Sequence, residues 1–162
     1  MKQRLNLELA APDGFRAVLN LEKYTRASVE PTLLHLIKVR ASVLNGCAFC
    51  IDMHSSDALA AGESSRRLFA VAAWRESPFF SREERAALAL TDAATQIADA
   101  GVPDAVWEEA RQFWSEKEMA NLLLAIVTIN AWNRIAIATH KLPPPLKARD
   151  AATLPEPHVQ SA

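Results

Sequence analysis

Signals that start and stop helices occur along the whole chain, and they constrain its fold more than any other feature of the sequence. The segments Ser81-Arg-Glu-Glu84 and Ser115-Glu-Lys-Glu118 are capping boxes, in which a serine and a glutamate three residues apart satisfy free N–H groups at a helix start. Pro31 suits the first turn of another helix, because the N–H groups there lack partners within the helix. Only 4 of the 162 residues are glycine and 7% are aromatic, which favours helices over a sheet. The sequence therefore predicts an all-α protein.

Apolar residues between these signals predict a domain of about seven helices. They cover approximately residues 15–25, 31–44, 47–61, 64–74, 81–98 and 104–114, followed by a long core helix that contains the apolar segment 119–138. We expect Asn45 to cap the helix that begins at Cys47, and Gly62 to end it in the left-handed conformation. An N-terminal segment is expected over residues 1–14, with a turn at Pro12-Asp-Gly14. One helical domain follows over 15–140, and a C-terminal tail over 141–162 contains five of the nine prolines.

The charge balance excludes several classes of partner. Lysine and arginine total 18 against 19 acidic residues, so we expect neither a nucleic-acid footprint nor a basic membrane anchor. Polar residues interrupt the segment 119–138, which we interpret as a core helix whose polar groups have buried partners; they are Asn121, Asn130, Asn133 and Arg134. The first residues have no apolar stretch long enough for a signal peptide, so we expect a soluble, cytoplasmic protein. In that reducing compartment, two cysteines favour a catalytic or metal-binding role over a permanent disulfide.

Two cysteines and a histidine are spaced so that they share one face of a predicted helix. Cys47, Cys50 and His54 fall within a narrow arc at 3.6 residues per turn. The cysteines are close enough for a reversible disulfide, and the helix N-terminus favours their thiolate forms. His54 follows Cys50 by one turn and can accept its proton, which favours Cys50 as the attacking thiolate and Cys47 as the resolving thiol. A thioredoxin-like arrangement would reverse these roles, and the spacing alone leaves both open.

This arrangement is typical of peroxide reduction. A thiolate attacks the peroxide O–O bond and becomes a sulfenic acid, the second cysteine condenses with it, and an external dithiol restores the pair. No cofactor is required for this chemistry. Three other interpretations remain open at this point: ordinary packing of buried cysteines, a redox switch without turnover, and a zinc site in which His35 supplies a fourth ligand.

The segment Val39-Arg-Ala-Ser-Val-Leu-Asn-Gly-Cys47-Ala-Phe-Cys50-Ile-Asp-Met-His54 resembles the AhpD-like branch of the alkylhydroperoxidase and carboxymuconolactone decarboxylase family. The segments 73–81, 84–88 and 129–135 support the resemblance, which covers about residues 15–138. It implies an all-helical fold that forms homotrimers or homohexamers, and a peroxidase whose carboxyl-side cysteine attacks a small peroxide. It also implies a dithiol reductant protein of the lipoyl or thioredoxin type. A lactone decarboxylase, the activity of the other branch, would give the two cysteines no task.

One position departs from the family pattern. The family usually has a glutamate twelve residues before the first cysteine, as part of a proton relay to the histidine, and this chain has His35 there. A carboxylate stabilises a charged imidazole much better than a second histidine does. The sequence leaves three possibilities: His35 relays protons in its own way, Glu84 substitutes, or peroxidase turnover is weak. The replacement also completes a Cys2His2 set of zinc ligands.

Overall fold

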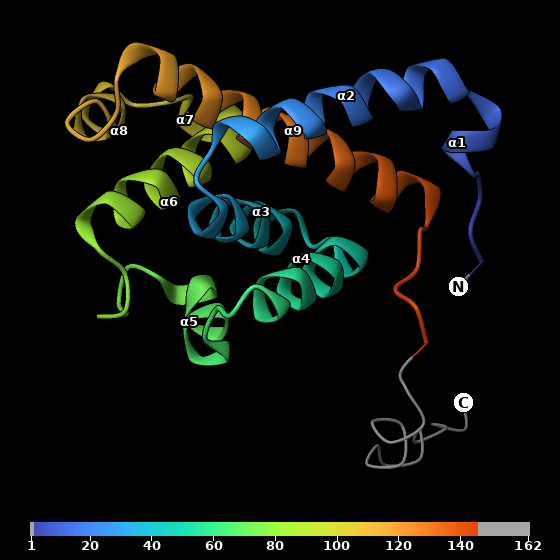
Figure 1. Cartoon of the computed structure of the whole chain (residues 1–162), viewed down its shortest axis with the longest axis horizontal. Helices are drawn as coiled ribbons and strands as arrows, with labels where there is room; N and C mark the ends of the chain where they lie inside the picture. The colour runs from blue at the N-terminus through green and yellow to red at the C-terminus, as the bar shows by residue number, and fades with distance from the viewer. Residues whose placement is uncertain (1, 146–162) are drawn as a thin grey trace.

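The computed structural model describes residues 2–145 and confirms the all-α prediction (Figure 1). No strand occurs in this range, and the helices run in the order α1 (Leu7–Ala10), α2 (Pro12–Ser28), α3 (Pro31–Asn45), α4 (Ala48–Ala60), α5 (Ser65–Ala70), a short 3₁₀ helix (Val71–Ala73), α6 (Arg82–Thr95), α7 (Ile97–Ala100), α8 (Asp104–Ala110) and α9 (Glu116–Thr139). The expected number of about seven helices was too low, because the single-turn helices α1 and α7 carry too few apolar residues to show periodicity.

The helix boundaries follow the predicted signals in most places. Both capping boxes are present, at the starts of α6 and α9. The turn predicted at Pro12-Asp-Gly14 is wrong, because Pro12 is the first residue of α2 and its fixed φ suits a helix start as well as a turn. The helices predicted over 81–98 and 104–114 end earlier, at Thr95 and Ala110.

Helix α3 lies in the middle of the fold, where it packs against α4, α6 and α9 (Figure 1). Nearly every residue from Leu33 to Ser42 is buried, as expected for a helix that is surrounded on all sides. One apolar cluster joins α3 to α6, α8 and α9, and a second joins it to α4, α5 and α6. The ends of α3 are therefore fixed, and the segment that follows it starts from a defined position.

The long apolar helix α9 is part of the core, as predicted. It is the helix among residues 2–145 whose length and composition would also suit a membrane span. In the fold it packs against α2, α3, α4 and α6, and it lies beside α2 along its length (Figure 1). Its polar residues Asn130 and Asn133 are buried with hydrogen-bond partners, which agrees with the structural role expected for them.

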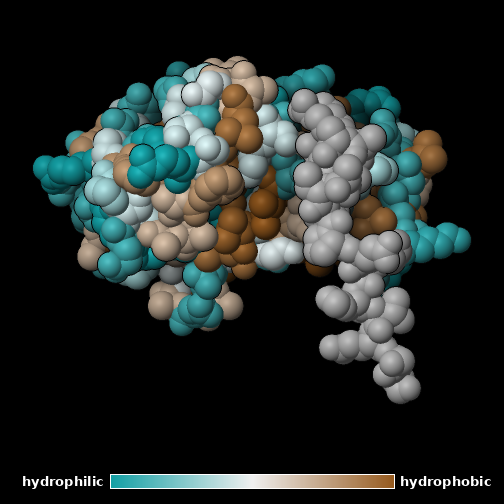
Figure 2. Space-filling model, turned by 90° about the horizontal axis from the view of Figure 1, so that it is seen from below, coloured by the Kyte–Doolittle hydropathy of each residue, from teal (hydrophilic) through white to brown (hydrophobic). Residues whose placement is uncertain are grey.

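Apolar residues also gather in a band on one face of the surface (Figure 2). Among the described residues, the most exposed large apolar side chains are Leu9 and Phe69, at 81% and 80%. The predicted homotrimer or homohexamer remains a prediction. The domain limits 15–140 also remain a prediction, and most of the expected tail, residues 146–162, lies outside the described part of the chain.

Candidate functional site

A left-handed glycine places the first cysteine. Gly46 follows the last residue of α3 with φ of 67°. Its N–H donates to the Val43 carbonyl at 3.1 Å, and the Cys47 N–H donates to the Ser42 carbonyl at 3.0 Å. This is a Schellman motif, which satisfies the last carbonyl groups of α3. The expectation that Asn45 caps the next helix is wrong: Asn45 is the last residue of α3, and Cys47 itself is the N-cap of α4.

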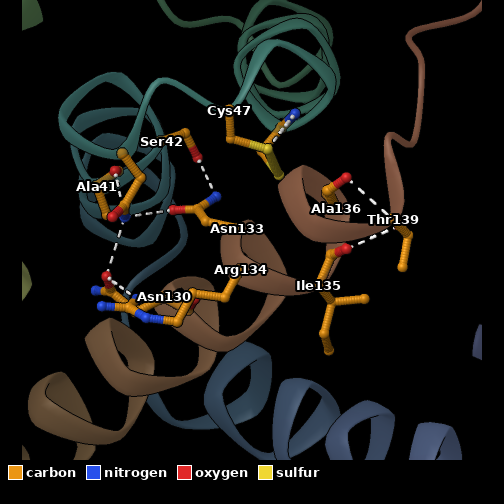
Figure 3. The surroundings of a disulfide bond; sticks show 11 residues. Ala41, Ser42, Cys47, Asn130, Asn133, Arg134, Ile135, Ala136 and Thr139 are labelled. Carbon is orange, nitrogen blue, oxygen red and sulfur yellow. Dashed lines mark hydrogen bonds between the residues drawn. A yellow bond between two sulfur atoms is a disulfide. The ribbon is translucent and has the colours of Figure 1, made fainter. Parts of the chain in front are cut away.

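Three asparagines fix this turn to the core helix. The Asn45 side-chain amide donates to the Asn130 and Asn133 oxygens at 3.0 and 2.9 Å. The Asn133 amide in turn donates to the Ser42 hydroxyl at 3.0 Å, beside the cysteine pair (Figure 3). Ser42 and Asn133 are fully buried, where a satisfied polar network specifies one arrangement strongly. The network therefore fixes the end of α3, and with it Cys47, relative to α9.

The two cysteines form a disulfide at the start of α4. Their Cα atoms are 5.3 Å apart, and both side chains are only 1% exposed. The Cys50 N–H donates to the Cys47 sulfur at 3.3 Å, so Cys47 uses its sulfur where a serine or aspartate N-cap would use oxygen. The partial positive charge of the helix start stabilises negative charge on that sulfur.

His54 lies one turn further along α4 and is 2% exposed. Burial, followed by the charge of Lys38, lowers the pKa of His54 to about 4, so the imidazole is neutral at neutral pH. The exposed Asp57 carboxylate lies 4.0 Å from His54 Nδ1. His54 Nε2 is buried and has no hydrogen-bond partner among the described residues.

The sequence analysis missed Glu22, a buried carboxylate on α2. Its Oε1 accepts a hydrogen bond from the Lys38 ammonium and one from Arg26 Nε at 2.7 Å, and its Oε2 is buried without a described partner. Burial raises the pKa of Glu22, but the hydrogen bonds and charges of Lys38 and Arg26 outweigh this and hold it below its ordinary value. The signal was present in the sequence, because Glu22 continues the apolar stripe of Phe15 and Leu19.

The other two acid–base candidates are His35 and Glu84, which lie on α3 and α6. His35 is half-buried on α3, with its Nδ1 buried and unpaired within the described structure. Burial, then the charge of Lys38, lowers its pKa. Glu84 caps α6 and forms an ion pair with Arg67 at 2.5 Å, which uses both of its oxygens. Glu84 is therefore not positioned to replace the family's glutamate.

A cavity of about 340 Å³ opens beside α4 and is bounded by α2, α9 and the N-terminal segment. Cys50 and His54 line it, whereas Cys47 does not. Its walls are mainly apolar and include Leu5, Leu7, Phe15, Leu19, Phe49, Met53, Trp132, Ile135 and Ala136. Charged side chains at the same cavity are Glu8, Glu22, Arg26 and Lys141. A larger hollow of about 770 Å³ near Arg67 and Glu84 contains none of the cysteine cluster. A small organic molecule in the first cavity would therefore meet Cys50 before Cys47.

The zinc alternative finds no ligand set in residues 2–145. No group of three or more histidine, cysteine, aspartate or glutamate side chains in this range is arranged to hold a metal ion. His35 does not line the cavity to which Cys50 and His54 contribute. The structure brings Cys47, Cys50 and His54 together as predicted, and adds Glu22.

Comparisons with known proteins agree with this fold. The model of the carboxymuconolactone decarboxylase family matches residues 11–93. The uncharacterized protein YdfG of Bacillus subtilis (strain 168) is 45% identical over 139 residues, which cover 85% of this chain and 95% of YdfG. The crystal structure of ATU0492 from Agrobacterium tumefaciens, a protein of unknown function considered a candidate AhpD antioxidant defence protein, is 42% identical with a TM-score of 0.87 and covers 90% of this chain and 100% of that one. The debrominase Bmp8 shares the fold at 24% identity, with a TM-score of 0.74 over 87% of this chain and 75% of its own. The chain belongs to the carboxymuconolactone decarboxylase family, in its AhpD-like part.

Proposed function

We propose that this protein is a thiol-dependent peroxidase that reduces small alkyl hydroperoxides. The observation that carries the proposal is the cysteine pair beside a buried neutral histidine, with Cys50 alone of the two reaching an apolar cavity. A cavity of about 340 Å³ admits a small organic hydroperoxide, and its apolar walls favour an alkyl or aryl group over water. The active form is the reduced dithiol.

In the first step His54 accepts the proton of the Cys50 thiol. A neutral imidazole is the form that can do so, and His54 is neutral at neutral pH because burial lowers its pKa. The Cys50 thiolate then attacks the terminal peroxide oxygen and the O–O bond breaks. Cys50 becomes a sulfenic acid, and the departing alkoxide takes the proton from His54 and leaves as an alcohol.

In the second step Cys47 resolves the sulfenic acid. The Cys47 sulfur attacks the Cys50 sulfur, a disulfide forms and water leaves with the sulfenic oxygen. The Cα–Cα distance of 5.3 Å suits this bond without movement of the helix start. The peroxide has then gained two electrons and the two thiols have lost them.

Reduction of the disulfide completes the cycle. A dithiol reductant of the lipoyl or thioredoxin type attacks Cys50, the sulfur at the cavity, and Cys47 leaves as a thiolate. The second thiol of the reductant then attacks its own sulfur in the mixed disulfide, so Cys50 is released as a thiolate and the reductant leaves as a disulfide. The Cys50 N–H and the helix start stabilise that leaving sulfur, which favours attack at Cys50 over attack at Cys47. We also propose that the protein is cytoplasmic and works as a homotrimer or homohexamer.

Peroxide-driven thiol titration tests the function. We expect one equivalent of cumene hydroperoxide to remove both thiols of the reduced protein together and to form one intramolecular disulfide. Cys50→Ser should be unreactive, and Cys47→Ser should accumulate a sulfenic acid that dimedone traps. His140→Gln, which changes a histidine at the C-terminal end of α9, is the matched control and should react like the wild type.

Two results would contradict the proposal. If the thiols survive a tenfold excess of peroxide for an hour, the protein is not a peroxidase. The remaining interpretations would then be a redox switch that responds to another oxidant, or a protein without a redox role. Stoichiometric zinc in protein purified without added metal, with thiols that react only after chelation, would support the metal-binding alternative. A reaction at Cys47 in the Cys50→Ser variant would reverse the assigned roles.

A further inference from the structure

Two buried polar atoms without partners lie at the same cavity. They are Glu22 Oε2 on α2 and His54 Nε2 on α4, and neither has a hydrogen-bond partner among the described residues. The residues Glu22 and His54 are only 7% and 2% exposed. Buried polar atoms in proteins are nearly always paired, so two unpaired atoms at one cavity require an explanation.

Glu22 is an ionised carboxylate with one oxygen in reserve. Lys38 and Arg26 both donate to Oε1, and they hold the pKa of this buried acid below its ordinary range. The ion pairs with Lys38 and Arg26 therefore use only one of the two carboxylate oxygens. The second oxygen carries negative charge into a sheltered space, where electrostatic interactions are stronger than in water.

We infer that Glu22 positions and charges the catalytic base: its free oxygen accepts a hydrogen bond from the imidazolium that forms when His54 takes the Cys50 proton. The bond is direct or passes through one water in the cavity. This rests on the proposed function for the identity of His54 as the base. Glu22 supplies the carboxylate that position 35 lacks in this chain, where a histidine stands instead.

The charges of the cluster balance in this arrangement. Proton transfer converts a neutral thiol and a neutral imidazole into a thiolate and an imidazolium, so the net charge of the site does not change. The imidazolium then interacts with the Cys50 thiolate and with the Glu22 carboxylate. Each anion favours the charged form of His54 and offsets the burial that disfavours it.

The other charged groups around His54 cannot play this part. Asp57 is 45% exposed and lies 4.0 Å from the other ring nitrogen, so water screens its charge. Lys38, Arg26 and His35 all disfavour the imidazolium. Glu8 and Lys141 also line the cavity and are exposed at its rim. Among the described charged groups named here, Glu22 is the carboxylate that is buried.

The direction in which removal of the Glu22 charge shifts the pKa of the Cys50 thiol distinguishes action through His54 from direct action on Cys50. If the Glu22 charge acted on Cys50 through space alone, its removal would lower the pKa of the thiol, because a nearby anion disfavours a thiolate. If Glu22 acts through His54, its removal weakens the imidazolium partner and raises the pKa of the thiol. A purely structural role changes stability and leaves the pKa of the thiol unchanged.

The test measures the pH dependence of Cys50 alkylation by iodoacetamide in the full-length Cys47→Ser protein, which requires no peroxide turnover. We expect Glu22→Gln to move the midpoint of alkylation upward by about 1 to 3 pH units, the range for loss of one close opposite charge. At a pH below both midpoints this slows alkylation by about tenfold or more. Glu8→Gln, the same change at the rim of the same cavity, should leave the midpoint within about 0.3 units, well below that range.

Two further variants make the outcome decisive. Glu22→Gln leaves the buried Lys38 ammonium unpaired, so Glu22→Gln with Lys38→Met keeps the site neutral if the single variant does not fold. In a His54→Asn background, Glu22→Gln should cause no upward shift, because the base through which it acts is absent. An unchanged or lowered midpoint in folded Glu22→Gln and in the double variant would overturn the inference. Failure of peroxide turnover alone would overturn the proposed function and leave this result standing.

Discussion

Acidification should destabilise the disulfide form of the protein through His54. Burial and the charge of Lys38 lower the pKa of this histidine from 6.5 to about 4 in the folded state. Since the folded pKa lies below the unfolded value, the unfolded chain binds more protons between these two pH values. The histidine therefore contributes its full stability above about pH 6.5 and loses it as the pH falls toward 4.

The size of the effect follows from the shift. Each pKa unit corresponds to 1.36 kcal/mol, so the histidine accounts for about 3 kcal/mol of lost stability at pH 4 and about 2 kcal/mol of it by pH 5. The His54 side chain is 3% exposed, so solvent screening reduces this loss only slightly. A domain whose total stability is about 5–15 kcal/mol would show such a loss clearly.

Urea unfolding of the oxidised protein at pH 8, 6.5 and 5 measures it, with His54→Gln beside the wild type. The other titrating groups, including His35, are common to both proteins, so the difference between the two curves isolates His54. We expect the wild type to lose about 2 kcal/mol more than the variant between pH 8 and pH 5. Parallel losses in the two proteins would refute the reasoning that this histidine is buried in its neutral form.

Three further predictions concern a glycine, a buried ion pair and the cavity wall. Gly46→Ala should lower the free energy of unfolding in urea by about 1–2 kcal/mol, because the φ of 67° strains any residue with a Cβ, although no atom lies near the added carbon. Gly14→Ala, inside α2, should instead raise the free energy of unfolding by up to about 1 kcal/mol. Equal effects of the two substitutions would contradict this reasoning. Asp92→Asn should cost about 3–5 kcal/mol in thermal unfolding, because Asp92 pairs both oxygens with the buried Arg40; a loss below about 1 kcal/mol would contradict a buried pair. Ala136→Leu should narrow the cavity and slow the reduction of cumene hydroperoxide about tenfold, which corresponds to about 1.4 kcal/mol in the activation free energy. The reduction of hydrogen peroxide should be unaffected and serves as the control. Equal slowing of both reactions would exclude the cavity as the route by which the organic peroxide reaches Cys50.

Local signals in the sequence predicted the helical architecture well. The capping boxes at Ser81 and Ser115 depend on residues three apart, and both are present. Errors occurred where one local signal fits two structures. Proline followed by Asp-Gly suits a turn and also a first helical turn, and packing of α2 against α9 decides between them. At the turn between α3 and α4, both Asn45 and Cys47 could serve as the N-cap of α4. The left-handed Gly46 ends α3 after Asn45, so Cys47 is the N-cap.

The chemical site was predicted only where its residues lie on one helix. Cys47 is the N-cap of α4, and Cys50 and His54 lie on that helix, so helical spacing was enough to group them. Glu22 lies 32 residues before His54 in the sequence, and its place beside the cavity depends on how α2 packs against α9. Single-helix spacing cannot show that packing. The absence of a carboxylate at position 35 left three possibilities open in the sequence, and none of them named Glu22.

The boundary between α3 and α4 ties the site to local cooperativity. The amide of Cys47 closes α3, and the sulfur of the same residue opens α4. Fraying of either helix end breaks the hydrogen bond that holds the other, so the two ends open together as one unit. The asparagines on α9 resist that opening through Asn45 and Ser42. Cys47, the proposed resolving thiol, therefore joins the ends of two helices, and its position beside Cys50 persists as long as both helix ends do.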